Sequence, residues 1–169
     1  MTDAATTVNR AYRRHRFGPV ELHLRPDSTD AVGPSGIVVR IGAAVTSFPL
    51  GDRLLGTGVP VEVGGVPAAH LRQPERGRRR RDRCVIVEPI VGSPLPPGLF
   101  FRLRWWRRPT LETSAEGLVA RRFWPMSPHR PSTAPEVVET VFLLYAAGAP
   151  VVKASLGSAV AVGPPVAHD

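Results

Sequence analysis

The fold is predicted most clearly by one stretch of sequence, Ser35-Gly-Ile-Val-Val-Arg-Ile-Gly-Ala-Ala-Val-Thr-Ser-Phe-Pro-Leu-Gly-Asp-Arg-Leu-Leu-Gly-Thr57. The β-branched run from Ile37 to Ile41 is typical of a strand. The segment Phe48–Arg53 predicts a turn, with Gly51 at a position that needs a positive φ. Because glycines and turn residues separate its apolar runs, the stretch predicts short strands joined by tight turns.

Strand patterns continue on both sides of this stretch. Residues 20–25 alternate apolar and polar side chains, residues 59–63 are extended, and Gly64-Gly65 predicts a hairpin turn. Residues 84–91 and 99–106 predict two further strands, the second with Arg102, Arg104 and Trp106 on one face. Residues 26–30 predict a loop.

Helical patterns are confined to the C-terminal third. A capping box formed by Thr133 and Glu136 precedes apolar residues at helical spacing, which predicts a helix at about 134–147, ended by Gly148 and Pro150. Residues 114–123 predict a short helix, weakened by a glycine. The fold class expected from the residues is therefore mainly β, with one C-terminal helix and disordered or irregular Arg/Pro/Gly-rich segments.

The composition is basic and rich in turn residues. The 169 residues include 16 Gly and 19 Pro, and the formal net charge is +8 although Lys153 is the only lysine. One interpretation is a set of solvated arginines that reflects GC-rich coding. The other is a polyanionic partner, such as nucleic acid or an acidic membrane surface. The single Cys84 excludes an intramolecular disulfide and a cysteine-rich zinc site.

The chain is expected to divide into five segments: a disordered N-terminus (1–9), a β segment (10–71), a basic loop or linker (72–83), strands plus the helix (84–150) and an apolar flexible tail (151–169). No membrane span is expected, because Pro150 and Lys153 interrupt the apolar C-terminal region. The N-terminal residues lack the pattern of a signal peptide, so we expect a cytoplasmic protein. The sequence does not predict an oligomeric state.

Residues 33–57 resemble the GroES-like domain of the medium-chain dehydrogenase/reductase superfamily, in its quinone oxidoreductase branch. The resemblance is carried by Gly36, Gly42 and the triplet Gly51, Asp52 and Arg53, with weaker support from residues 10–25. It implies a partial GroES-like β-barrel and, in an active member, NADPH as cofactor. No glycine-rich cofactor fingerprint follows. The expectation is a diverged or truncated quinone oxidoreductase-like protein without independent catalysis, and no catalytic, cofactor-binding or metal residue is assigned.

Two alternatives remain open. The first is a small basic β-domain that binds nucleic acid through guanidinium and indole groups, since phosphate attraction and base stacking are what single strands require. Its residues would be Arg78, Arg79, Arg80, Arg81, Arg102, Arg104, Trp105 and Trp106. The second is a product of a frame-shifted or non-functional reading frame. A nucleophile–base pair of Cys84 and His70 has no motif to support it.

Overall fold

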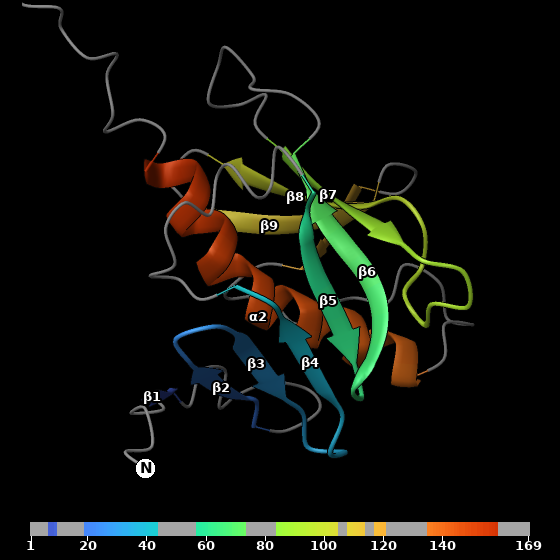
Figure 1. Cartoon of the computed structure of the whole chain (residues 1–169). Coiled ribbons are helices and arrows are strands. Elements are labelled where there is room, and N and C mark those ends of the chain that lie inside the picture. Colours follow the sequence, from blue (N-terminus) through green and yellow to red (C-terminus); the bar gives the residue numbers. More distant parts are fainter. Residues whose placement is uncertain are drawn as a thin grey trace, which may run out of the picture.

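The computed structural model describes residues 7–9, 19–43, 57–73, 84–104, 108–113, 117–120 and 135–158. Ten strands form a single sheet in sequence order, and each strand is antiparallel to its neighbours (Figure 1). The elements are β1 (Thr7–Asn9), β2 (Glu21–Leu24), β3 (Thr29–Val32), β4 (Val38–Ile41), β5 (Val59–Val63), β6 (Val66–Arg72), β7 (Cys84–Pro89), β8 (Leu99–Arg104), β9 (Arg108–Thr113), β10 (Gly117–Ala120) and the helix α2 (Pro135–Ser158).

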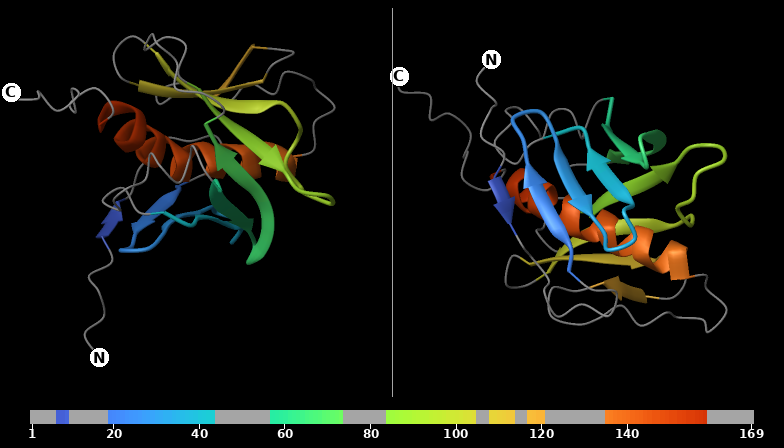
Figure 2. Two further views of the ribbon diagram at one scale, coloured as in Figure 1. Left: turned by 45° about the horizontal axis from the view of Figure 1, so that its top comes forward. Right: turned by 90° about the horizontal axis from the view of Figure 1, so that it is seen from below.

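The sheet curls around the helix. In both views of Figure 2, α2 lies between β2–β4 on one side and the later strands on the other, and it contacts β3, β4, β8 and β9. A register shift between Val61 and Glu62 in the β5–β6 pair adds local twist where the sheet bends. Within the described residues no pairing joins β1 to β10. The predicted mainly β fold, a partial barrel with one C-terminal helix, is confirmed.

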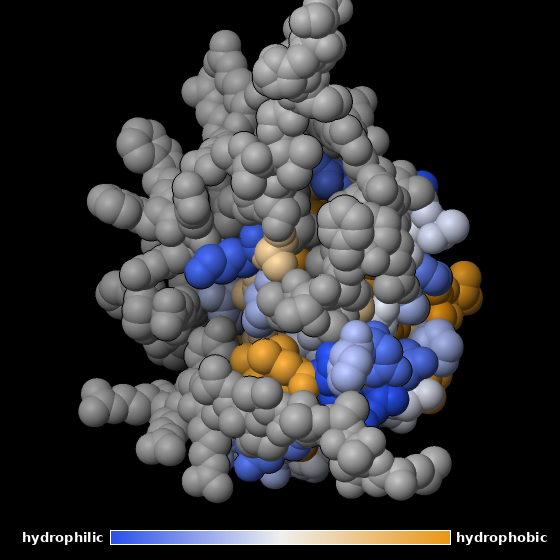
Figure 3. Space-filling model, turned by 60° about the vertical axis from the view of Figure 1, so that its left-hand side comes forward, coloured by the Kyte–Doolittle hydropathy of each residue, from blue (hydrophilic) through white to orange (hydrophobic). Residues whose placement is uncertain are grey.

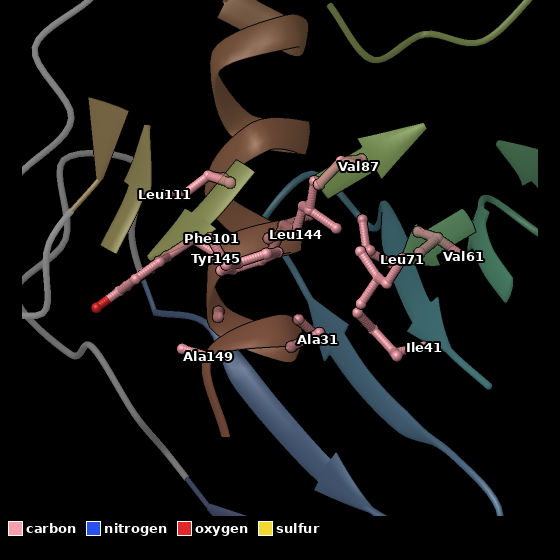
Figure 4. Packing of buried hydrophobic residues seen from close by; sticks show 14 of the residues in the cluster. Ala31, Ile41, Val61, Leu71, Val87, Phe101, Leu111, Leu144, Tyr145 and Ala149 are labelled. Atoms are coloured by element: carbon pink, nitrogen blue, oxygen red, sulfur yellow. The ribbon is translucent and has the colours of Figure 1, made fainter. Parts of the chain in front are cut away.

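The core follows the period of two in the strands. In β4, β5 and β7 the buried residues stand at alternate positions, and the residues between them belong to the outer face of the sheet. Figure 4 shows this arrangement, with side chains from both halves of the sheet converging on Leu144 and Tyr145 of α2. The buried sheet residues in this view include Ala31, Ile41, Val61, Leu71, Val87, Phe101 and Leu111. One core therefore joins the strands on either side of the basic segment.

The helix begins where the sequence predicts but continues to Ser158, so the predicted end near residue 147 was wrong. Pro150 lies inside it and removes one backbone hydrogen bond, at a cost of about 3 kcal/mol. Val151 and Val152 are fully buried, and each such burial contributes about 1.5–3 kcal/mol. Packing on the sheet therefore offsets the proline. Residues 151–158, expected to be part of a flexible tail, are helical.

Three other expectations also differ from the structure. Residues 7–9, expected to be disordered, form β1 and pair with β2. Thr29 and Asp30, expected in a loop, begin β3. Residues 117–120, expected in a short helix, form β10 against β9. In each case a neighbouring strand supplies hydrogen-bond partners, which outweighs the weak local preference of these residues.

Candidate nucleic-acid interface

The outer face of β2–β5 carries a row of charged residues. Cross-strand register places Asp30 beside Arg40, and Arg40 beside Glu62. Asp30 is buried, and Arg40 holds it with two hydrogen bonds, Nε to Oδ1 at 2.9 Å and Nη2 to Oδ2 at 3.0 Å. Arg25 approaches the same carboxylate at 3.6 Å. The hydrogen bonds to Asp30 and the charge of that carboxylate raise the pKa of Arg40 above its ordinary value. These two arginines therefore stabilise the sheet.

A second polar cluster lies on β8 and β9. Arg102 Nε is 3.5 Å from Oε2 of the buried Glu112, and its guanidinium stands over the Phe100 ring at 5.3 Å. Thr110 Oγ1 donates to Glu112 Oε2 at 3.3 Å. Arg102, which the sequence placed among the nucleic-acid-binding residues, is therefore matched by a carboxylate and stacked on an aromatic ring.

The last paired position of the β8–β9 hairpin contains two arginines. Arg104 and Arg108 are direct cross-strand partners at the last paired position, and the connection between them reads Trp105-Trp106-Arg107. Like charges at directly opposite positions destabilise an antiparallel pair. The register therefore places two arginines opposite each other at this end of the hairpin.

The described residues are close to neutral as a set. They contain seven Arg or Lys residues and eight Asp or Glu residues, whereas the whole chain has 22 and 14. The positive excess therefore belongs to residues outside the described ranges. On the face in Figure 3, hydrophilic and hydrophobic described residues occur close together in small groups.

Sheet topology brings two of the most basic connections to one edge. Neighbouring strands run in opposite directions, so the β6–β7 and β8–β9 connections leave from the same edge of the sheet. We call the strand ends there, Arg72, Cys84, Arg104 and Arg108, the basic edge. The β6–β7 connection, residues 74–83, contains six arginines and two acidic residues. Arg72 itself pairs with Glu88 at 3.3 Å between half-exposed side chains.

The remaining predicted site residues divide into described and undescribed ones. Gly36 adopts a φ of 88° in the β3–β4 turn. Gly42 donates its N–H to the Pro60 carbonyl at 2.8 Å, and a Cβ there would lie 2.6 Å from the Pro60 ring. Gly36 has open space around it and serves the turn through its positive φ, whereas Gly42 allows the close approach of Pro60. The predicted residues Gly51, Asp52, Arg53, Arg78, Arg79, Arg80, Arg81, Trp105 and Trp106 lie outside the described residues.

Cys84 and His70 are not brought together. His70 is paired in register with Glu88, which is four residues from Cys84 on β7. Four residues of strand span roughly 13 Å, so no nucleophile–base contact forms between them. Among the described residues, no group of three or more His, Cys, Asp or Glu side chains is arranged to hold a metal ion.

Several polar residues that organise the structure were not singled out from the sequence. Asp30 was assigned to a loop, and the cluster of Glu112 and Thr110 lies on β9, which the sequence did not predict. Glu139 on α2 is buried and accepts from the Ser35 hydroxyl at 2.7 Å and from the Ser35 N–H at 3.3 Å. The role of Asp30 could have been inferred from the sequence, because an arginine at a polar strand position, here Arg40, is stabilised by an acidic residue opposite it on the neighbouring strand.

One helix in the described part of the chain is long and apolar enough to cross a membrane, at Glu136–Ala154. Most of it is buried against the sheet, as expected for a core helix that is apolar on all sides. Its composition is therefore weak evidence for a span.

Comparisons with known proteins complete the description of the site. No family model, no curated protein and no solved structure matches this chain.

Proposed function

We propose that the protein binds single-stranded nucleic acid at the basic edge, with the end of the β8–β9 hairpin as the central contact. The observation that carries this proposal is the cross-strand pairing of Arg104 with Arg108. Two arginines at directly paired positions provide the positive charge that attracts a phosphate diester. The two tryptophans between them in the sequence supply the stacking groups that unpaired bases use.

The pairing of the other strand arginines supports this location. Arg40 is bound to a buried carboxylate, and Arg102 is matched by Glu112. Releasing either to a phosphate would remove an arginine that neutralises a buried carboxylate, which is costly. The 74–83 connection leaves from the same edge of the sheet and contains further arginines. The phosphate contacts are therefore expected at the hairpin end and in that connection, rather than across the outer face.

The experiment is a fluorescence-anisotropy titration of a labelled single-stranded 15-mer with the full chain. Arg108→Ala is compared with Arg25→Ala, since both remove one guanidinium group and Arg25 lies away from the hairpin, beside Asp30. We expect Arg108→Ala to weaken binding several-fold and Arg25→Ala to have little effect. Equal losses would show that only net charge matters, and absence of binding at about 50 mM salt would contradict the proposal.

The resemblance to quinone oxidoreductases stays a prediction. A partial β-barrel with glycines at the β3–β4 turn and at the end of β4 is compatible with it. A thermal-shift titration with NADPH addresses it directly. Stabilisation at low millimolar cofactor would support a retained cofactor site. If the midpoint temperature does not shift, only a diverged, non-catalytic relative of the quinone oxidoreductases would remain compatible with the resemblance.

The shared hydrophobic core argues against the hypothesis that the chain is the product of a frame-shifted or non-functional reading frame. Residues 84–104, residues 108–113 and the helix α2 contribute side chains to one core with the strands before residue 73. This consistency between pattern and packing supports a folded product. A far-UV circular dichroism spectrum dominated by strand signal, with a cooperative thermal transition, is the expected result. A random-coil spectrum would favour the out-of-frame alternative.

A further inference from the structure

The acids that hold the strand arginines differ in how deeply they are buried. The carboxylates paired with Arg40 and Arg102 belong to side chains that are only 3% and 5% exposed. Glu88, which pairs with Arg72 at the basic edge, is 43% exposed. An exposed ion pair contributes little to stability, and a carboxylate in contact with water can lose its partner without becoming an unpaired buried charge. Arg72 can therefore leave its acid for another anion.

The contact between Arg72 and Glu88 is loose, and it draws the guanidinium away from the basic edge. Arg72 Nη1 donates to Glu88 Oε1 at 3.4 Å and to Oε2 at 3.3 Å, and both distances are long for a charge-assisted hydrogen bond. Glu88 is opposite His70 in the register, two residues before Arg72 at the end of β6. The carboxylate therefore holds the guanidinium back along the strand, and its release would bring the guanidinium toward the edge.

The stem of Arg72 is held in place near the hairpin end. A Cβ built at Gly58 would lie 2.9 Å from Arg72 Cγ and 3.5 Å from its Cδ, so the stem packs on this glycine and only the guanidinium needs to move. By register Arg72 is level with Phe100, two strands away and four residues before Arg104. Arg72 is thus roughly 16 Å from Arg104, about five nucleotides even at the 3.4 Å spacing of a duplex strand. One bound oligonucleotide can reach both arginines.

We infer that Arg72 exchanges Glu88 for a phosphate when single-stranded nucleic acid binds, and that Glu88 limits the affinity of the basic edge by competing for this arginine. The inference rests on the proposed function and adds to it a further phosphate contact and an acid that opposes binding. A carboxylate and a phosphate both accept hydrogen bonds from a guanidinium group, so only one of them holds it fully at a time. Neutralising Glu88 should therefore strengthen nucleic-acid binding through Arg72.

The test is a fluorescence-anisotropy titration of a labelled single-stranded 15-mer with the full chain at about 0.1 M salt. Glu88→Gln keeps the shape of the side chain and removes its charge. Its matched control is Glu21→Gln, because Glu21 is 45% exposed and also belongs to an ion pair, with His23. Three strands separate Glu21 on β2 from β6, and exposed charges more than about 10 Å apart are largely screened at this salt. Both variants are also made in an Arg72→Ala background.

We expect Glu88→Gln to tighten binding about two- to fivefold, as expected when an exposed ion pair no longer competes, and Glu21→Gln to change it less than about 1.5-fold. Arg72→Ala should weaken binding, and in that background Glu88→Gln should have no more effect than the control. Equal effects of the two glutamine variants, or a Glu88→Gln effect that persists without Arg72, would overturn the inference in favour of general electrostatics.

The same titrations separate a failure of this inference from a failure of the proposed function. If the wild type binds and Arg108→Ala weakens binding, but Glu88→Gln behaves like Glu21→Gln, the basic edge binds nucleic acid and the exchange at Arg72 is wrong. If the wild type does not bind at about 50 mM salt, the proposed function is wrong and the exchange with it. Thermal unfolding followed by circular dichroism checks that the variants are folded, as expected for changes to an exposed ion pair.

Discussion

Replacing Gly148 with alanine tests how closely α2 lies against β8. A Cβ at this position would overlap the ring of Phe101, which is itself completely buried. Alanine is the better helix former by about 1 kcal/mol, while forcing an extra methyl group into a packed core costs about 1–3 kcal/mol. Because the ring is enclosed and cannot swing into solvent, the cost should outweigh the gain. We expect a net loss of up to about 2 kcal/mol.

Urea and thermal denaturation followed by circular dichroism measure this loss. For a chain of this size the midpoint temperature should fall by up to roughly 8 °C. The matched control is a double-mutant cycle with Phe101→Leu, which makes room for the methyl group. The two substitutions together should destabilise less than the sum of the single effects, by about 1 kcal/mol or more. A Gly148→Ala protein that is more stable than the wild type would refute the close packing of helix and sheet.

Three further substitutions test individual contacts by the same denaturation measurements. Asp30→Asn should lower stability by about 1 kcal/mol, since its arginine partners are almost half exposed and solvent screens the lost ion pairs; an unchanged protein would mean that the pairs contribute nothing. Ser35→Ala removes a donor from the buried Glu139 and should also cost about 1 kcal/mol, whereas Ser35→Thr should retain most of it. Gly42→Ala should lower the unfolding midpoint because its Cβ meets the Pro60 ring, and a midpoint equal to that of the wild type would contradict this contact.

The strands could be predicted where alternation and β-branched residues agree, as in β2, β4 and β5, and the Gly64-Gly65 hairpin was predicted from its turn residues. Both glycines adopt the positive φ that a two-residue hairpin requires. The course of the helix beyond Gly148 could not be predicted in this way. Local signals end a helix at Gly148 and Pro150, and only the burial of Val151 and Val152 against the sheet explains its continuation.

The candidate site was only partly visible in the sequence. Arginine and tryptophan content indicated a polyanion partner, but content does not say which arginines are engaged by acids. The structure decides this: Arg102 Nε lies 3.5 Å from Oε2 of Glu112, a diagonal neighbour on β9, whereas Arg104 is opposite Arg108 in the strand register. Because β9 was not predicted, neither partner could be assigned from sequence. The neighbours of an arginine across strands depend on the register, a long-range property that local sequence patterns do not give.

The salt dependence of oligonucleotide binding tests the central claim most directly. The logarithm of the association constant of the full chain is measured against the logarithm of salt concentration, for the wild type and for Arg104→Ala/Arg108→Ala. If both arginines contact phosphates, the double variant should bind more weakly and its slope should be shallower by about 1.4, or 0.7 for each contact to a single strand. Identical slopes and affinities for the two proteins would contradict the assignment of the β8–β9 hairpin end as the nucleic-acid interface.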